Sequence, residues 1–244
     1  MKTALIDGDI VAFRAAYKAE RVFDFGDDIY STVADLREAR GHYDCMVSDI
    51  LKGSGCTEFR MVFSDPSGRS FRHDIYEDYK KNRHSYSNRK PIIFKTLRDE
   101  LIDGGAIFRA NLEGDDVLGI MQTSAPNTVI CTIDKDLKNI PGLHYNFDKD
   151  IHSSVSKEGA YKFFLTQVLA GDPTDGIPGI TGVGHKTAEK ILEKGGYSWA
   201  TVVAAYEKAG MNEETALTMA RLVRILDKDL YDPIKHTPIL WSPR

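Results

Sequence analysis

The chain has 244 residues, which is long enough for one sizeable α/β domain with a smaller helical part. Its composition, 42% hydrophobic and 28% charged, is that of a globular protein and excludes a disordered or fibrous chain. The formal net charge of −4 excludes a uniformly basic surface, so any contact with nucleic acid must come from a local cluster of cations.

The first part of the chain, residues 1–156, is predicted to alternate strands with helices. Short runs rich in β-branched and aromatic residues predict strands at 3–7, 58–63, 106–109 and 128–133. Apolar residues at helical spacing predict helices at 10–17, at about 28–51, from Pro91 to about 102, and at 113–122. This alternation predicts an α/β fold with a parallel sheet, whose functional site lies at the carboxyl ends of the strands.

From about Lys157 the pattern becomes wholly helical. Helices are predicted at 186–192, 199–209 and 213–226. We therefore expect a helical part at 157–232 and, because of its three prolines, an extended tail at 233–244.

Two features bear on where the protein works. No apolar run approaches the ~20 residues that a membrane span needs, and the short apolar start ends at Asp7, unlike a signal peptide. The cysteines Cys45, Cys56 and Cys131 are far apart and lack a zinc-binding spacing, which favours reduced thiols. We expect a cytoplasmic protein with no membrane association.

Acidic residues follow several of the predicted strands or stand in short clusters. They are Asp7, Asp65, Glu113, Asp115, Asp116, Asp134, Asp136, Asp172 and Asp175. An isolated acid is weak evidence, because an aspartate after a strand is often a helix cap, and for Asp7 the cap is as plausible as a functional role.

The set as a whole favours a metal site. Burying many like charges together is costly unless cations neutralise them. Oxygen ligands without histidine or cysteine select Mg²⁺ or Mn²⁺ rather than zinc. Two such ions about 4 Å apart can activate a water molecule and stabilise the leaving oxygen of a phosphodiester.

A basic stretch at about 69–98 is a candidate phosphate-binding surface. Its cations are Arg69, Arg72, Lys80, Lys81, Arg83, Arg89, Lys90, Lys95 and Arg98. Arginine and lysine bind phosphate, and tyrosines between them can stack on unpaired bases. Tyr76, Lys80 and Arg83 would share one face of a helix. The alternative is a solvated amphipathic helix, which the charges alone favour.

A glycine turn opens one of the later helices. Gly182, Val183 and Gly184 precede Lys186 and Thr187, as in a helix–hairpin–helix-type element. Glycines let the backbone approach a phosphate, and a helix N-terminus favours an anion. The alternative is an ordinary glycine turn.

Together these stretches resemble the flap-endonuclease/5′-nuclease family, which includes the 5′→3′ exonuclease domain of bacterial DNA polymerase I. The matching stretches are Leu5-Ile6-Asp7-Gly8; Asp65 with Ser70-Phe71-Arg72-His73 and Tyr79-Lys80-Lys81-Asn82-Arg83; Leu112-Glu113-Gly114-Asp115-Asp116-Val117; Thr132-Ile133-Asp134-Lys135-Asp136-Leu137; and Gly171-Asp172-Pro173-Thr174-Asp175-Gly176-Ile177-Pro178-Gly179. They cover nearly the whole chain. The compact length, Gly176 and the ending Ile239-Leu240-Trp241 look like the stand-alone exonucleases of short-tailed bacteriophages.

The resemblance implies a parallel-sheet, PIN-like 5′-nuclease core with a basic gateway or arch, and a helical part with a helix–hairpin–helix-type (H3TH) element. It implies a first metal site at Asp7, Asp65, Glu113, Asp115 and Asp116, and a second at Asp134, Asp136, Asp172 and Asp175.

The resemblance also implies roles in binding DNA. Lys80 and Arg83 would contact the scissile phosphate, and Tyr79 would stack near the displaced nucleotide. Arg72 and Lys81 would bind DNA. The glycine turn would hold the downstream duplex, either alone or together with a K⁺ ion bound at the turn. Asp9 departs from the small residue of many relatives, and a helix-start acid also has a structural use, so its role stays open.

The expected function is a divalent-metal-dependent 5′→3′ exodeoxyribonuclease that also cuts flaps and removes RNA primers, in phage DNA replication or DNA degradation. Its partners would be DNA with a 5′ end or flap, RNA–DNA hybrids and replication proteins, with the chain as a monomer in the host cytoplasm. Alternatives are a PIN-type ribonuclease, an inactive nucleic-acid-binding protein of the same fold, and a metal-dependent phosphatase. A PIN-type ribonuclease would not explain the helical part and the glycine turn. An inactive binding protein would not explain the complete acidic set. A phosphatase would not explain the basic gateway.

Overall fold

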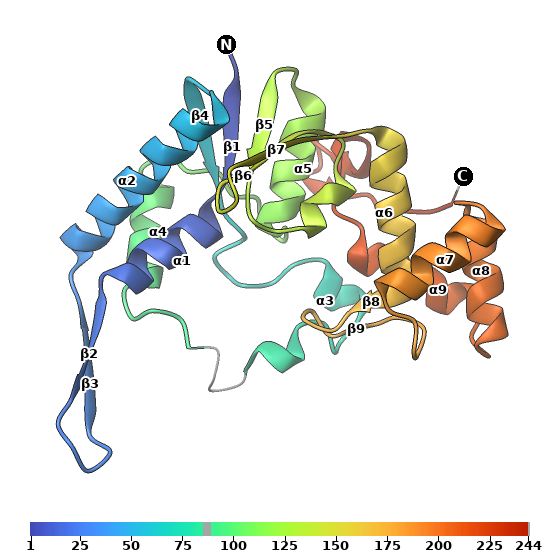
Figure 1. Cartoon of the computed structure of the whole chain (residues 1–244), viewed down its shortest axis with the longest axis horizontal. Coiled ribbons are helices and arrows are strands. Elements are labelled where there is room, and N and C mark those ends of the chain that lie inside the picture. The colour runs from blue at the N-terminus through green and yellow to red at the C-terminus, as the bar shows by residue number, and fades with distance from the viewer. Residues whose placement is uncertain (85–88, 244) are drawn as a thin grey trace.

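The computed structural model describes residues 1–84 and 89–243, without the side chains of Arg83 and His84 (Figure 1). A five-stranded sheet forms its centre, in the order β4-β1-β5-β6-β7. The first four are parallel and β7 is antiparallel to β6. Their bounds are β1 Thr3–Asp7, β4 Glu58–Val62, β5 Thr128–Cys131, β6 Gly142–Asn146 and β7 Ile151–Val155.

Helices cover both faces of this sheet. The first face carries α1 (Gly8–Lys18), α2 (Leu36–Ser54) and α4 (Phe94–Asp103), and the other carries α5 (Gly114–Ser124). Successive side chains of a strand point to opposite faces, so β1 supplies Ala4 and Ile6 to the first core and Leu5 to the second. This two-sided burial explains why β1 is a continuous apolar run.

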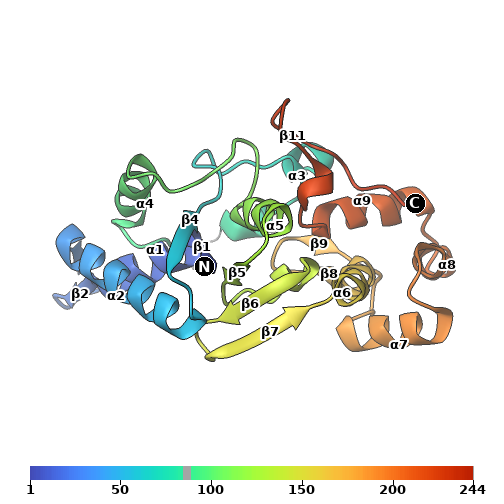
Figure 2. The same ribbon diagram turned by 90° about the horizontal axis from the view of Figure 1, so that it is seen from above.

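A second group of helices forms the later part of the chain, at the opposite end from α1, α2 and α4 (Figure 2). It comprises α6 (Lys157–Ala170), α7 (His185–Gly195), α8 (Trp199–Lys208) and α9 (Glu213–Val223), which share one apolar core. The α6 helix begins where Ser156 caps it by accepting a hydrogen bond from the Gly159 amide at 2.9 Å.

Short elements connect and close this helical group. The ribbon of β8 (Gly171–Asp172) and β9 (Ile177–Pro178) leads from α6 toward α7. After α9 come η4 (Lys228–Leu230), β10 (Tyr231–Asp232) and β11 (Thr237–Pro238). The tail then packs on the helices, because the Trp241 ring contacts the rings of Phe164 and Trp199.

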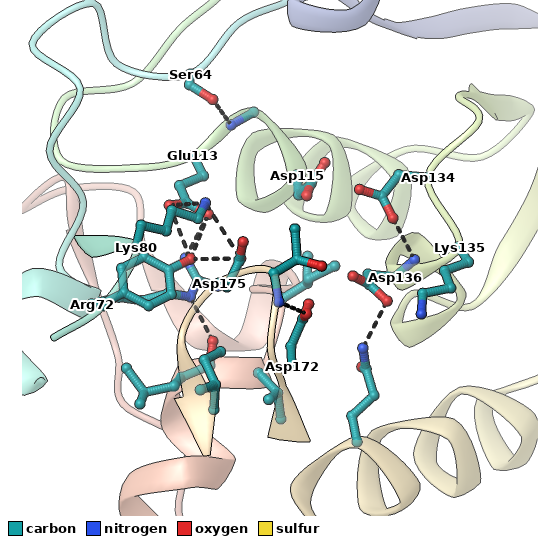
Figure 3. Close-up of a pocket in the computed structure, with 18 of the residues that line it drawn as sticks. Ser64, Arg72, Lys80, Glu113, Asp115, Asp134, Lys135, Asp136, Asp172 and Asp175 are labelled. Atoms are coloured by element: carbon teal, nitrogen blue, oxygen red, sulfur yellow. Dashed lines mark hydrogen bonds and ion pairs between the residues drawn. The ribbon is translucent and has the colours of Figure 1, made fainter. Parts of the chain in front are cut away.

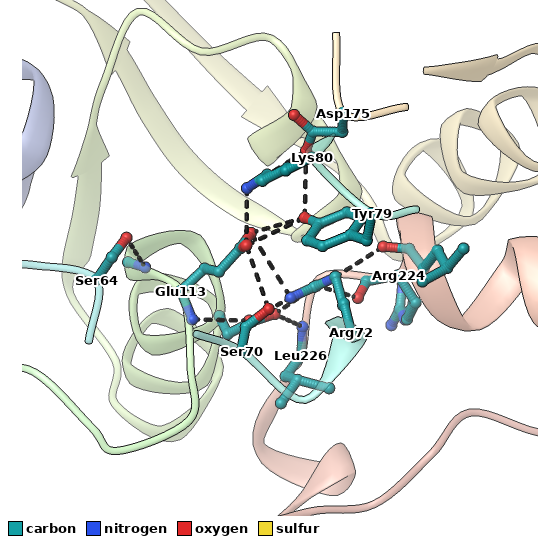
Figure 4. A network of polar contacts seen from close by, with 12 residues as sticks. Ser64, Ser70, Arg72, Tyr79, Lys80, Glu113, Asp175, Arg224 and Leu226 are labelled. Carbon is teal, nitrogen blue, oxygen red and sulfur yellow. Dashed lines mark hydrogen bonds and ion pairs between the residues drawn. The ribbon is translucent and has the colours of Figure 1, made fainter. Parts of the chain in front are cut away.

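A buried ion pair joins the two parts. Arg72, which is 3% exposed, donates to both carboxylate oxygens of Asp116 on α5, at 2.7 and 2.8 Å. The same guanidinium donates to the carbonyl oxygens of Leu222 and Arg224 at the end of α9, each at 2.8 Å. Asp116 in turn accepts from the Leu226 amide at 3.1 Å. The pair therefore ties the sheet, the gateway and the helical part together (Figure 4).

Several predicted elements are confirmed and others are wrong. Strands at 3–7, 58–63 and 128–133 and the later helices are present. The helix predicted from about 28 instead begins at Leu36, because residues 20–34 form the hairpin of β2 (Glu20–Asp24) and β3 (Tyr30–Ala34). Its turn has positive φ angles at Gly26, Asp27 and Asp28, which no helix can contain. The strand predicted at 106–109 is reduced to one bridge between Val62 and Ile107.

The helical face predicted for the basic stretch is also wrong. Its helix, α3, covers only Arg72–Ile75, and the 3₁₀ helix η1 covers Lys81–His84. Between them Tyr76 is extended and Lys80 is left-handed, with φ of +56°. Tyr76, Lys80 and Arg83 therefore do not share a helix face. No helix in the described ranges has the length and apolar character needed to cross a bilayer.

We expect Asp116→Asn to lower the free energy of unfolding by about 3–5 kcal/mol, because it removes the bidentate partner of a buried cation and leaves Arg72 only the more distant Glu113 carboxylate, 3.8 Å away. Urea unfolding followed by circular dichroism measures this loss. Asp148→Asn is the matched control, since the Asp148 pair with Arg14 is also bidentate but lies at the surface. Its loss should stay below about 1 kcal/mol. Equal losses in the two variants would contradict the role given to the buried pair.

Candidate active site

A cleft opens at the carboxyl edge of the sheet, between β1, β5 and α5 on one side and the β8–β9 ribbon on the other (Figure 3). Its charged lining is dominated by acids. The acids are Asp7, Asp9, Glu113, Asp115, Asp134, Asp136, Asp172 and Asp175, and the cations are Arg72, Lys80 and Lys135. The fold therefore brings seven of the nine predicted acids, and Asp9 with them, to one place.

Asp7 ends β1 and caps α1. Its carboxylate accepts from the Ile10 amide at 3.3 Å and from the Thr132 hydroxyl at 2.8 Å. Burial, together with the charges of Asp9 and Asp134, raises the pKa of Asp7 to about 7. The cap interpretation of Asp7 is thus confirmed. The capping residue also lies in the cleft, and its functional role there stays a prediction.

The start of α5 supplies two further acids, Glu113 and Asp115. Burial raises the pKa of Asp115 well above its usual range, and the nearby charges of Asp134 and Asp7 add to this effect. Asp115 belongs to the first predicted metal group and Asp134 to the second. The two groups therefore adjoin in a single cluster of like charges.

Asp134 and Asp136 follow β5, and Asp172 approaches from the ribbon. The Asp136 amide donates to the Asp134 carboxylate at 2.8 Å, and the Thr174 amide donates to Asp172 at 2.8 Å. Burial and the charges of Asp134 and Asp172 raise the pKa of Asp136 to about 7. This part of the cleft contains more negative charge than its own cations balance.

Lys80 enters the cleft from the gateway. Its ammonium lies 2.7 Å from Glu113 and 3.5 Å from Asp175. Its amide donates to the Asp175 carbonyl at 2.8 Å, and Gly176 packs closely beside it, where a Cβ would lie 3.1 Å from the Asp78 carbonyl oxygen. Although burial opposes it, the charges of Lys80 and Arg72 hold the pKa of Glu113 down at about 2.

Three predicted residues lie away from the cleft or are too buried for their predicted roles. The Asp65 carboxylate accepts from the amides of Ser67 and Asn111, at 2.9 and 2.7 Å, outside the cleft. Asp116 is 0% exposed and bound to Arg72, so its oxygens are used within the protein. Arg72 itself is buried by the same pair and cannot reach DNA. We therefore remove Asp65 and Asp116 from the candidate ligands and Arg72 from the DNA contacts.

Tyr79 also needs a correction. It is 2% exposed, and its hydroxyl donates to Glu113 at 3.0 Å and to Asp175 at 3.2 Å. A ring packed in the helical core cannot stack on a nucleotide, so Tyr79 acts by holding these two carboxylates (Figure 4). The predicted role of Arg83 falls on a side chain outside the described residues.

The basic stretch does not form one continuous face. Arg72 and Arg98 are buried. Others have acidic partners: Arg69 pairs with Asp74, Lys81 with Asp78, Arg89 with Glu20 and Lys95 with Asp99. Local acids therefore balance much of the charge that the sequence places there.

Sequence reasoning missed the polar residues that hold the acids in place. The Asp9 carboxylate accepts from the Ser64 amide at 2.8 Å, and the Ser64 hydroxyl accepts from the Gly114 amide at 2.9 Å. Asp9 therefore both lines the cleft and links α1 to the start of α5. The Gln167 side chain donates to Asp136 at 2.9 Å. No local pattern marks Ser64 or Gln167 as a site residue, whereas Thr132 begins one of the stretches that resemble the family.

The glycine turn is exposed and open. Gly182 has a φ of +80° and Gly184 is the N-cap of α7. A Cβ at either position would meet no atom within 4 Å, so the protein's own packing leaves the space above both glycines free. Lys186 and Thr187 are exposed on the first turn of α7. The surface can thus accept an anion at the helix N-terminus.

The donor set of the cleft suits hard divalent cations. The acidic side chains that line it offer carboxylate oxygens, which are the ligands that such cations prefer. In the described ranges no three acidic, histidine or cysteine side chains already converge around a single point. The pKa values of Asp7, Asp115 and Asp136 are raised first by burial and then by the charges of neighbouring carboxylates. A cation placed among them would relieve this repulsion.

We expect the metal-free protein to lose stability as pH rises from about 4 to about 7. Asp7 and Asp136 have ordinary pKa values of 3.8, raised to about 7 in the folded state, so folding binds protons in this window. Thermal unfolding in EDTA measures the fall. Asp136→Asn should reduce it, whereas Asp103→Asn, at an exposed acid outside the cleft, should not. Equal pH dependence in Asp136→Asn and the wild type would contradict the assignment.

Comparison with known proteins places this cleft in a family. A model described as the 5′-3′ exonuclease, N-terminal resolvase-like domain, matches residues 2–152. The exodeoxyribonuclease of Enterobacteria phage T3 is 25% identical and covers 98% of this chain and 92% of its own. The exonuclease of Escherichia phage T7 is 26% identical, over 98% of this chain and 93% of its own.

Solved structures share the fold. The T5 D15 protein co-crystallised with metal ions has a TM-score of 0.70 at 16% identity, over 92% of this chain and 90% of that one. The catalytic core of Rad2 in complex with a DNA substrate has a TM-score of 0.50 at 13% identity, over 99% and 83%. The predicted PIN-like α/β fold is confirmed. The chain belongs to the 5′-3′ exonuclease family and is a nuclease, a hydrolase of phosphodiester bonds.

Proposed function

We propose that this nuclease uses divalent cations, Mg²⁺ or Mn²⁺, to degrade DNA from a 5′ end, and that it also cuts flaps and RNA primers. One observation carries the proposal: Asp7, Asp115 and Asp136 share a cleft in which their negative charges are not balanced. The metal ions co-crystallised with the T5 D15 protein support it.

Five carboxylates would hold the cations. They are Asp7, Asp115, Asp134, Asp136 and Asp172. Bound Mg²⁺ supplies an activated water molecule and neutralises charge on the leaving oxygen. Asp172 reaches the cleft on the β8–β9 ribbon. All five carboxylates therefore meet only when the ribbon keeps its position relative to the sheet.

Lys80 would orient the scissile phosphate. Its ammonium is held at the cleft by Glu113 and Asp175, and Tyr79 fixes both of these carboxylates from behind. A phosphate oxygen can then accept a hydrogen bond from Lys80 without reorganisation of the side chain, which favours the transition state. Arg83 would act beside it and stays a prediction.

The turn at 181–184 would hold the duplex. The open space above Gly182 and Gly184 and the first turn of α7 suit a phosphate, with K⁺ as an option there. Lys186, Thr187 and the exposed Lys81 would add contacts, with Val183 part of the same turn. The DNA bound to the Rad2 core supports a DNA partner. We further propose that the enzyme works as a cytoplasmic monomer alongside replication proteins.

Product mapping tests this function directly. With Mg²⁺ and 5′-labelled blunt duplex, we expect labelled mononucleotides, and with a flap substrate one cut at the junction. An RNA–DNA hybrid labelled on the RNA should also release its label. Asp134→Asn should bind DNA but not cleave it, because a cation ligand is lost. Fragments that shorten from the 3′ end would contradict the polarity, and near wild-type cleavage by Asp134→Asn would contradict the metal assignment.

Lys80→Ala should slow the chemical step by about 10²–10³-fold, because one preorganised donor to the phosphate is removed. Single-turnover cleavage at saturating enzyme separates this step from binding. Lys228→Ala is the control: its ammonium is exposed and pairs with Asp229 at 2.8 Å, outside the cleft lining. It should keep the wild-type single-turnover rate. A Lys80→Ala effect confined to DNA affinity would remove Lys80 from the catalytic residues.

A further inference from the structure

A chain of buried polar side chains lies behind Asp136. Gln167 on α6 is 3% exposed, and Asn139 at the end of η3 (Asp136–Asn139) is 0% exposed. Arg224 follows α9 and is also largely buried. Burying two amides and a guanidinium costs free energy unless each group finds a partner. Their partners lead step by step to the cleft.

The contacts run in one direction. The Arg224 Nη1 group donates to Asn139 Oδ1 at 3.2 Å. The Asn139 amide nitrogen donates to Gln167 Oε1 and, at 3.3 Å, to the Val223 carbonyl oxygen. The Gln167 amide nitrogen donates to Asp136 Oδ1 at 2.9 Å, the contact drawn to Asp136 in Figure 3.

The arginine sets the orientation of both amides. A guanidinium has only donors, so Asn139 must turn its oxygen toward Arg224 and its nitrogen toward Gln167. Gln167 must then accept with its oxygen, which leaves its nitrogen for Asp136. The Asp227 carboxylate, 2.6 Å from Arg224 Nη2, holds the guanidinium in place. Arg224, at the far end of this row of hydrogen bonds, thus determines that Gln167 presents its nitrogen to Asp136.

We propose that Gln167 is a positioning residue of the active site, which holds the Asp136 carboxylate ready for a divalent cation, and that Asn139 and Arg224 fix its polarity. The inference rests on the proposed function, since it assumes that Asp136 binds the cation. A donor at Oδ1 fixes the rotamer of Asp136 against the repulsion of Asp134 and Asp172. Partners of this kind typically change metal affinity or activity by about 10–100-fold.

The position of Gln167 gives this contact a second consequence. Asp136 belongs to the sheet part, whereas Gln167 and Arg224 belong to the helical part. The row of hydrogen bonds from Arg224 to Asp136 therefore couples the candidate ligand Asp136 to the packing of α6 and α9. The competing explanation is that Gln167 only fills the core, in which case its loss would lower stability and leave metal binding unchanged.

Gln167→Met tests the proposal by keeping the length of the side chain and removing the donor. Gln122→Met is the matched control, because Gln122 is also a helical, buried glutamine, 7% exposed, whose nitrogen donates to the Leu143 carbonyl at 3.1 Å. Mn²⁺ binding without DNA is measured by titration calorimetry, and unfolding by urea. We expect Gln167→Met to weaken Mn²⁺ binding by about tenfold or more. Gln122→Met should bind Mn²⁺ with the affinity of the wild type, even if its free energy of unfolding falls.

Asn139→Asp is the second variant, needed if Gln167→Met does not fold. It keeps a partner for Arg224 but presents only acceptors to Gln167, so the Gln167 amide must turn and face Asp136 with its oxygen. We expect weaker Mn²⁺ binding although Gln167 is intact. Wild-type Mn²⁺ binding by Gln167→Met or, if that variant does not fold, by Asn139→Asp would overturn the proposal and leave the proposed function standing. A wild-type protein that binds no Mn²⁺ would overturn both.

Discussion

The buried pair of Arg72 and Asp116 is the interaction on which the arrangement of this protein depends. Asp116 lies in the first turn of α5, beside Glu113 and Asp115, and Arg72 reaches across to the carbonyl oxygens that end α9. The cleft needs ligands from both parts of the chain, so their relative position must be held firmly. A bidentate charged pair that is almost wholly buried does this, because breaking it would leave Arg72 without solvent and with only the Glu113 carboxylate, 3.8 Å away, as a counterion.

The cleft itself divides into two electrostatic halves. Around Glu113 and Asp175 the protein supplies its own cation, Lys80, and the pKa of Glu113 falls. Around Asp7, Asp115 and Asp136, burial and the neighbouring carboxylates outweigh the charges of Lys80 and Lys135, and the pKa values rise. The first half is ready to orient an anion through Lys80. We propose that a divalent cation binds in the second half, where it would offset the repulsion between the acids and let a chain of net negative charge act on a polyanion.

Much of the fold and the site followed from local patterns. Apolar runs predicted β1, β4 and β5. The acids after β1 and β5 meet at one sheet edge in the cleft, as predicted, whereas Asp65, after β4, lies outside it. The hairpin of β2 and β3 was missed because its apolar residues also fit a helical spacing, and only the left-handed turn at 26–28 excludes the helix. The paired strands β6 and β7 were missed as well, since their hydrogen bonds join residues that no local pattern links.

The sequence by itself determined the chemistry: which acids, which lysine and which glycine turn are available, because residue type and spacing fix charge and backbone freedom. Only the tertiary structure decided which of them meet. Asp65, Asp116, Arg72 and Tyr79 carry the right groups, yet packing and hydrogen bonding assign them to internal contacts. Gln167 carries no motif, yet packing places it on Asp136. Whether a carboxylate can bind a cation or serves the fold depends on the hydrogen-bond partners that packing places beside it. The acidic cleft is made by contacts between distant parts of the chain.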